Sequence, residues 1–160
     1  MQWETVADDA VEKTGIDYRR AMMPDHRAAA RRLVEASASG ALDELCAAFG
    51  VRLLALFGSA AHDGDSAELP RDLDVAVAFR REATGDLFGF IDRLAALTGP
   101  AELDPLDLDA AEPVARAEAL SGTPLYEDTD GAFAEARIAA LLDRWDTAWL
   151  RRLQLEQLTS

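Results

Sequence analysis

Several kinds of residue are scarce in this chain of 160 residues, and each scarcity excludes a class of protein. Cys46 is the only cysteine, so no internal disulfide can form and the composition fits a reducing cytoplasm. No apolar stretch approaches the roughly 20 residues that span a bilayer. The first residues are acidic, whereas a secretory signal is basic and then apolar. We therefore expect a cytoplasmic protein that does not enter a membrane.

Basic residues are also few, with 16 Lys and Arg against 30 Asp and Glu, and the formal net charge is −14. Affinity for nucleic acid rests largely on Lys and Arg contacts to phosphates, so direct nucleic-acid binding is not expected. A single nucleotide held through a metal ion remains compatible with this charge. The acidic surface itself has two interpretations, which are solubility and attraction to a basic partner protein.

The length and composition fit one globular domain, because 49% of the residues are apolar and 160 residues can bury a sizeable core. Residues 1–24 show weak periodicity and end at a proline, so we treat them as an extension and residues 25–160 as a single domain. Helices and strands of the α/β (α+β) class are expected throughout this domain. The expected helices cover 26–37, 41–49, 87–97 and 114–120, and the expected strands cover 51–57, 71–79 and 101–108.

The last expected helix is the longest and covers about residues 131–158. Six apolar residues recur on it at helical spacing: Ile138, Leu141, Leu142, Trp145, Trp149 and Leu153. Such a stripe more often packs into a core than forms an interface. The helix would be about 40 Å long, however, which exceeds what a small sheet covers. This length leaves its distal end open to a partner or to a second copy of the chain.

Two aspartates open the strand expected over residues 71–79. Side chains alternate between the faces of a strand, so Asp72 and Asp74 point the same way. Ala76 and Ala78 follow on that face and leave room for a ligand or a packed helix. Paired carboxylates repel each other unless a cation lies between them, and oxygen ligands suit a hard divalent ion such as Mg²⁺. The pattern therefore predicts a metal site.

A glycine and a serine follow the preceding strand. Gly58 lets backbone and ligand approach closely, and Ser59 adds a hydroxyl donor for a phosphate oxygen. Gly-Ser after a strand is usually a simple turn, so this pair indicates phosphate binding only in combination with the aspartates.

A third carboxylate would complete the metal site, and Asp104 is our choice. It follows Leu103 in an apolar-rich strand and shares a face with Leu106. Asp107 and Asp109 are the rivals, but both fall on the opposite face of a regular strand, and Asp109 can serve the following helix as a cap.

Taken together and in order, these residues resemble the minimal nucleotidyltransferase (MNT) family of the polymerase-β-like superfamily. The resemblance rests on Gly58-Ser59, Asp72-Leu73-Asp74, Leu103-Asp104 and the segment Gly122–Tyr126, and it covers roughly residues 40–127. It implies a small mixed sheet flanked by helices. It also implies that Asp72, Asp74 and Asp104 bind two Mg²⁺ ions, that Asp104 helps activate a hydroxyl, and that Gly58 and Ser59 hold the phosphates of ATP.

Many members of that family are antitoxins that transfer AMP to a tyrosine of a HEPN-type toxin, so the resemblance also implies this partner and this activity. The chain departs from the family between Ser59 and Asp72, where the loop is longer than is common and His62 replaces an arginine. Two alternatives therefore stay open. One is a catalytically weak MNT protein that neutralises its partner by binding alone, and the other is a small-molecule nucleotidyltransferase of the aminoglycoside-modifying type.

Overall fold

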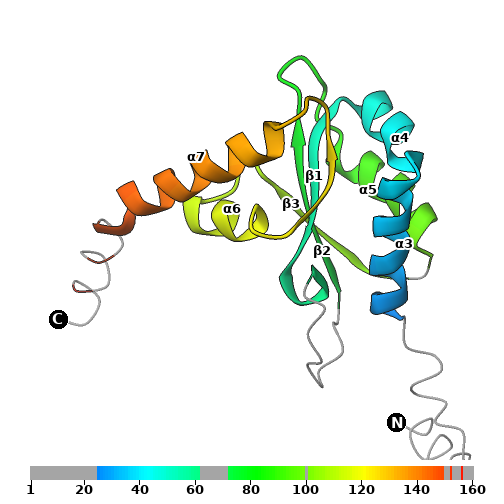
Figure 1. Ribbon diagram of the computed structural model, residues 1–160, viewed down its shortest axis with the longest axis horizontal. Coiled ribbons are helices and arrows are strands. Elements are labelled where there is room, and N and C mark those ends of the chain that lie inside the picture. The colour runs from blue at the N-terminus through cyan, green and yellow to red at the C-terminus, as the bar shows by residue number, and fades with distance from the viewer. Residues whose placement is uncertain (1–24, 62–71, 100, 150–151, 153–155, 157–160) are drawn as a thin grey trace, which may run out of the picture.

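The computed structural model describes residues 25–61, 72–99 and 101–149, together with residues 152 and 156. Within these ranges a four-stranded sheet lies between two groups of helices (Figure 1). The predicted extension, residues 1–24, lies outside the described residues. The elements are α3 (His26–Ala38), α4 (Ala41–Phe49), β1 (Val51–Phe57), the 3₁₀ turn η1 (Gly58–Ala61), β2 (Leu73–Phe79), α5 (Leu87–Thr98), β3 (Leu103–Asp107), α6 (Pro113–Ala119), β4 (Thr123–Glu127) and α7 (Ala132–Asp146).

The strand order is β3-β2-β1-β4, and the sheet is mixed, as expected. Strand β1 pairs antiparallel with both β2 and β4, whereas β2 and β3 run parallel. Both prolines of the sheet, Pro105 and Pro124, lie on the edge strands β3 and β4. Proline lacks a backbone donor, so it is tolerated at an edge, where half of the backbone groups have no ladder partner. The two long apolar strands, β1 and β2, therefore occupy the centre.

Strand β4 was not expected from the sequence, where residues 123–127 entered only through the family resemblance. The segment is short and contains Pro124, which weakens any strand signal. In the structure it covers the free edge of β1 and buries Leu125 beneath α3 and α4. The hydroxyl of Ser37, near the end of α3, donates to the carbonyl oxygen of Leu125 at 2.5 Å. Tertiary contacts thus fix a strand that local propensity does not specify.

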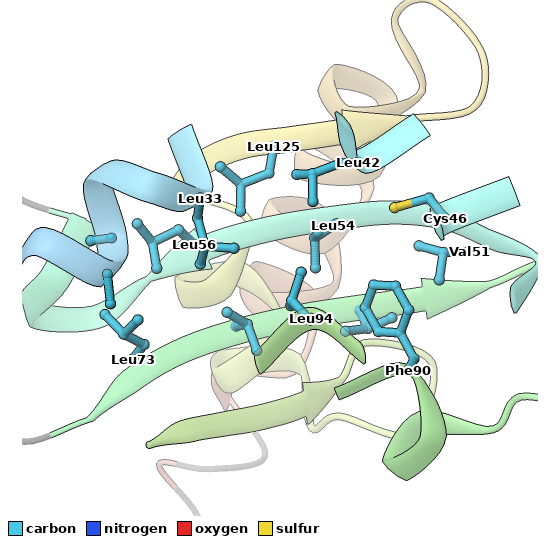
Figure 2. Close-up of a cluster of buried hydrophobic side chains, with 14 of the residues drawn as sticks. Leu33, Leu42, Cys46, Val51, Leu54, Leu56, Leu73, Phe90, Leu94 and Leu125 are labelled. Atoms are coloured by element: carbon cyan, nitrogen blue, oxygen red, sulfur yellow. The ribbon is translucent and has the colours of Figure 1, made fainter. Parts of the chain in front are cut away.

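One face of the sheet carries the main apolar core, which α3, α4 and α5 cover (Figures 1 and 2). Leu73, Val75, Val77 and Phe79 of β2 point to this face, as alternation predicts. Leu33 of α3 and Phe90 of α5 are fully buried against them. Cys46 of α4 also belongs to this core. Burial, together with the charge of Asp43, raises the pKa of Cys46 to about 12, so its thiol stays protonated.

The opposite face carries a smaller core beneath α6 and α7. Ala76 and Ala78 of β2 are fully buried on this face, where Ala117 of α6 and Phe133 of α7 belong to the same cluster. The small side chains let a helix lie close to the sheet, so the space predicted beside these alanines is filled by a packed helix and not by a ligand.

Most of the apolar stripe predicted on the last helix, α7, does not pack into the core. Phe133 and Ala140 are its buried residues, and Leu141 is half-buried against the same cluster. Ile138, Leu142, Trp145 and Trp149 are exposed by 60%, 52%, 69% and 59%. The helix reaches beyond α6, away from the sheet (Figure 1), so the sheet has no surface to offer this stripe. Ala148, Trp149, Arg152 and Glu156 are also helical, but most of the predicted end of the helix lies outside the described residues. No helix within the described ranges is long and apolar enough to cross a membrane.

The two phenylalanines of α5 provide a matched test of this core. Phe90 is fully buried and makes edge-to-face contacts with Phe49 and Phe79, at centroid distances of 5.7 and 6.4 Å. Phe88 is 79% exposed. We expect Phe90→Ala to lower the free energy of unfolding by about 3–5 kcal/mol, because it leaves a cavity and removes aromatic contacts. Phe88→Ala should change it by less than about 0.5 kcal/mol. Urea denaturation followed by circular dichroism measures both, and equal losses would contradict the core assignment.

Candidate functional site

The candidate site lies where three strands meet at one end of the sheet. Strand β1 finishes there, and the parallel strands β2 and β3 begin there, with η1 following directly on β1 (Figure 1). The register pairs Asp74 with Asp104 on neighbouring parallel strands and Phe57 with Asp74 across the antiparallel pair. Residues paired in this way face the same side of the sheet, so strand pairing alone places the side chains of Asp74 and Asp104 together.

The structure brings the three carboxylates selected from the sequence into one cluster. Asp72, Asp74 and Asp104 each offer an oxygen atom, and these oxygens lie within 4.8 Å of one another. Asp72 and Asp74 are half-buried, whereas Asp104 is exposed. Three carboxylate oxygens at this spacing form a donor set that a hard divalent cation can bridge.

The rival carboxylates have other roles. Asp107 accepts hydrogen bonds from the backbone N–H groups of Asp109 and Ala110, at 2.9 and 3.4 Å, and so stabilises the turn after β3. Asp109 forms an ion pair with Arg52 at 2.7 Å. Both lie at the end of β3 that is farther from the cluster. The alternation argument that preferred Asp104 over them is therefore consistent with the structure.

The electrostatics of the cluster are dominated by repulsion at Asp74. Burial raises the pKa of this carboxyl above its ordinary value, and the neighbouring charges of Asp72 and Asp104 raise it further. A hydrogen bond from its own backbone N–H opposes this rise, and a weaker repulsion comes from Glu118. A bound cation would relieve this repulsion.

Gly58 lies in direct contact with this cluster. Its φ of +68° is in the left-handed region, and a Cβ at this position would overlap Oδ2 and Cγ of Asp74. Glycine is therefore required for two independent reasons, which are the turn and the close approach of a carboxylate. Ser59 follows in η1 with its side chain exposed, at the same end of the sheet.

Sequence reasoning missed Glu118 as a neighbour of the cluster and gave Gly122 no role in the packing there. Glu118, on α6, lies near enough to Asp74 to affect its pKa. A Cβ on Gly122 would overlap the carbonyl oxygen of Leu56 and lie 2.8 Å from Cβ of Phe57, so the turn before β4 packs directly on the end of β1. Gly122 was selected only as part of the resemblance, and Glu118 carried no signal because its position depends on how α6 packs.

His62, named as a departure from the family, lies outside the described residues. Two cavities that described residues line are away from the carboxylate cluster. One of about 320 Å³ lies between β1, α6 and α7 and is lined by Arg52, Arg116 and Asp143 among others. Arg116 there donates to the carbonyl oxygens of Leu108 and Ala111, both at 2.8 Å, which gives it a structural role.

No protein-family model matches the sequence, and no curated protein matches it either. Solved structures do match. The crystal structure of the toxin–antitoxin complex MntA–HepT contains a chain that is 15% identical, with a TM-score of 0.55 over 76% of this chain and 96% of that one. A tri-AMPylated HEPN toxin of Shewanella oneidensis in complex with its MNT antitoxin gives 16% identity and a TM-score of 0.55, over 76% and 95%. A toxin–antitoxin structure with AMP-PNP gives 17% and 0.54, over 76% and 98%.

The chain has the nucleotidyltransferase fold. The mixed sheet flanked by helices, with a C-terminal helix, is shared with these structures over nearly their whole length. At 15–17% sequence identity, this structural likeness shows the fold alone. The chemistry has to be argued from the residues of this chain. In this nucleotidyltransferase fold the carboxylate cluster lies at the end of the central strands, beside the turn that starts at Gly58.

The repulsion at Asp74 makes a prediction about stability. Its pKa is raised in the folded state, so the protonated form is favoured by folding, and the free energy of unfolding falls as the pH rises above the ordinary aspartate pKa of about 3.9. Asp74→Asn removes this loss. We expect it to raise the melting temperature at pH 7 in EDTA and to abolish the rise that Mg²⁺ produces in the parent chain. Thermal unfolding followed by circular dichroism measures both effects.

Asp92→Asn is the matched control, because Asp92 is an exposed residue of α5 and the substitution changes the net charge equally. It should leave both the melting temperature in EDTA and the response to Mg²⁺ unchanged. An Asp74→Asn variant that melts below the parent in EDTA would show that the carboxylates do not repel one another.

Gly58→Ala tests the contact between the turn and the cluster. The added methyl group displaces Asp74 and imposes a left-handed φ on alanine, which costs about 1–2 kcal/mol for the backbone alone. Gly131→Ala is the control, because Gly131 has φ +86° but nothing within 4 Å of an added Cβ. We expect both variants to be destabilised but only Gly58→Ala to weaken Mn²⁺ binding, by at least about tenfold, in isothermal titration calorimetry. Equal Mn²⁺ affinities would contradict the contact.

Proposed function

We propose that this chain is an Mg²⁺-dependent nucleotidyltransferase that transfers AMP from ATP to a hydroxyl group of a partner HEPN toxin, and so acts as its antitoxin. The observation that carries this proposal is the cluster of Asp72, Asp74 and Asp104 next to the Gly58 turn, at the end of a nucleotidyltransferase sheet. A tyrosine is the acceptor we favour.

The donor set fits Mg²⁺. All three side chains are carboxylates, their oxygens lie within 4.8 Å of one another, and the charges of Asp72 and Asp104 add to burial in raising the pKa of Asp74. Asp72, Asp74 and Asp104 would hold the metal. When bound, Mg²⁺ supplies charge neutralisation on the phosphates and lowers the pKa of a coordinated hydroxyl.

The residues of the chain have distinct parts in the transfer. Gly58 and Ser59 hold the β- and γ-phosphates, since the turn lacks a Cβ at Gly58 and offers the exposed hydroxyl of Ser59. The acceptor oxygen forms a bond to the α-phosphorus of ATP, and the bond from that phosphorus to the bridging oxygen breaks, so pyrophosphate leaves. Asp104 is the exposed member of the cluster and therefore the carboxylate that an incoming protein hydroxyl can reach; it takes up the proton.

The choice of partner and nucleotide is supported by the structural neighbours. One is an MNT antitoxin in a complex whose HEPN toxin carries three AMP groups, and another contains AMP-PNP, a non-hydrolysable analogue of ATP. The net charge of −14 agrees with a protein acceptor, because a nucleic-acid acceptor would be repelled.

The test is AMP transfer to the product of the neighbouring gene, the expected HEPN toxin, measured by intact mass after incubation with ATP and MgCl₂. We expect the toxin mass to rise by one or more AMP units and its ribonuclease activity to fall. Asp72→Asn should reduce the rate of transfer at least about 10³-fold, because it removes a metal ligand without changing the size of the side chain.

Asp107→Asn is the control, since Asp107 belongs to the neighbouring turn and an asparagine oxygen can accept the same hydrogen bonds. It should transfer AMP at the rate of the parent. A stable complex in which the toxin gains no mass, with ATP or other nucleotides and with Mn²⁺ in place of Mg²⁺, would replace enzymatic modification by neutralisation through binding alone.

A further inference from the structure

The exposed side of α7 carries apolar residues to which the proposed function assigns no role. Ile138, Leu142, Trp145 and Trp149 are all more than half exposed. At about 100° per residue they lie 120–180° around the helix from Phe133, which is buried. We call these four residues the α7 stripe. Isolated exposed apolar residues are common, but four on one helix face form a continuous patch.

We propose that the α7 stripe is a self-association surface, on which a second copy of this chain packs in a parallel, two-fold-symmetric helix pair. The proposal is independent of the proposed function, because the stripe contains none of the residues of the carboxylate cluster.

The exposed area is sufficient for such an interface. The exposures of the four side chains correspond to on the order of 500 Å² per copy, given that a buried aromatic residue alone covers about 150–250 Å². Two copies would thus remove on the order of 1,000 Å² from water, which is where specific interfaces begin. Two of the four residues are tryptophans, the residue type that dominates the energetics of interfaces.

The charges beside the stripe select the orientation. Glu135 and Asp146 lie along one edge of the stripe and Ala134 along the other, at about 100° per residue. The same rotation, continued beyond α7, puts Arg152 along the edge of Ala134. In a parallel pair the acidic edge of one copy meets the opposite edge of its partner, so that Asp146 faces Arg152 twice. In an antiparallel pair the two acidic edges would meet. Edge charges of this kind set helix orientation in coiled coils.

The helix is also nearly neutral, so two acidic chains can approach each other there. The whole chain carries a net charge of −14, but the segment 132–149 has three acidic and two basic residues, a net charge of −1. Every copy carries both an acidic edge and an edge with a basic residue, so the surface is complementary to itself, as an isologous interface requires.

The first experiment measures the oligomeric state of the full chain by sedimentation equilibrium. We expect a reversible dimer, and we expect Leu142→Glu to weaken it at least about tenfold. Phe88→Glu is the matched control, because Phe88 is also an exposed apolar residue but lies on α5, and its dissociation constant should equal that of the parent. Both positions are exposed, so circular dichroism should show a folded chain in each case. A chain that stays monomeric at about 100 μM overturns the proposal.

The second experiment tests the orientation by exchanging charges. Asp146→Arg and Arg152→Asp should each weaken the dimer by about fivefold, because each puts like charges opposite one another twice. An equimolar mixture of the two variants restores both attractive pairs, so it should associate as tightly as the parent. The two positions are six residues apart and do not contact each other within one helix. Dissociation constants that neither single exchange changes would overturn the parallel arrangement.

Discussion

The repulsion among three carboxylates is the constraint on which the arrangement of the sheet depends. The parallel register of β2 and β3 places Asp74 beside Asp104, and Asp72, just before β2, joins them in the cluster. Hydrophobic burial and strand pairing elsewhere must hold these groups in place, since their own interaction opposes folding when they are ionised. β2 is suited to this role because every residue from Val75 to Phe79 is buried. The core therefore stabilises a site that is destabilising without a cation.

Glycine and alanine occupy the positions near the cluster where two elements approach each other closely. Gly58 leaves space for Asp74, Gly122 lets the turn before β4 pack on the end of β1, and Ala76 and Ala78 let α6 lie close to the sheet. Each of these positions could accept a larger side chain only if a neighbouring element moved. Close packing of this kind is how a sheet fixes the position of carboxylates that would otherwise separate.

The parts of this structure that follow from local patterns could be predicted from the sequence. Alternation identifies β2, although the strand begins at Leu73 and not at residue 71, and it separates Asp104 from Asp107, because a two-residue period is fixed by backbone geometry. Asp72 lies just before the strand and still joins the cluster. Strand β4 could not be predicted, because its pairing with β1 is a long-range contact and Pro124 weakens the local strand propensity. The position of Glu118 beside Asp74 and the exposure of Trp145 share this origin, since both depend on how a helix packs and not on its periodicity.

The α7 stripe shows why periodicity alone misleads. A helix can carry apolar residues at helical spacing on two sides and bury only one of them. In α7, Phe133 and Ala140 form the buried side, and Leu142 and Trp145 form the exposed side. A helix that is apolar on both sides needs two packing surfaces, and the small core beneath α7 supplies one. The described residues of the chain do not supply the other. Because the strand pairing puts the start of α7 and the carboxylate cluster at opposite ends of the sheet, association and cation binding can act independently.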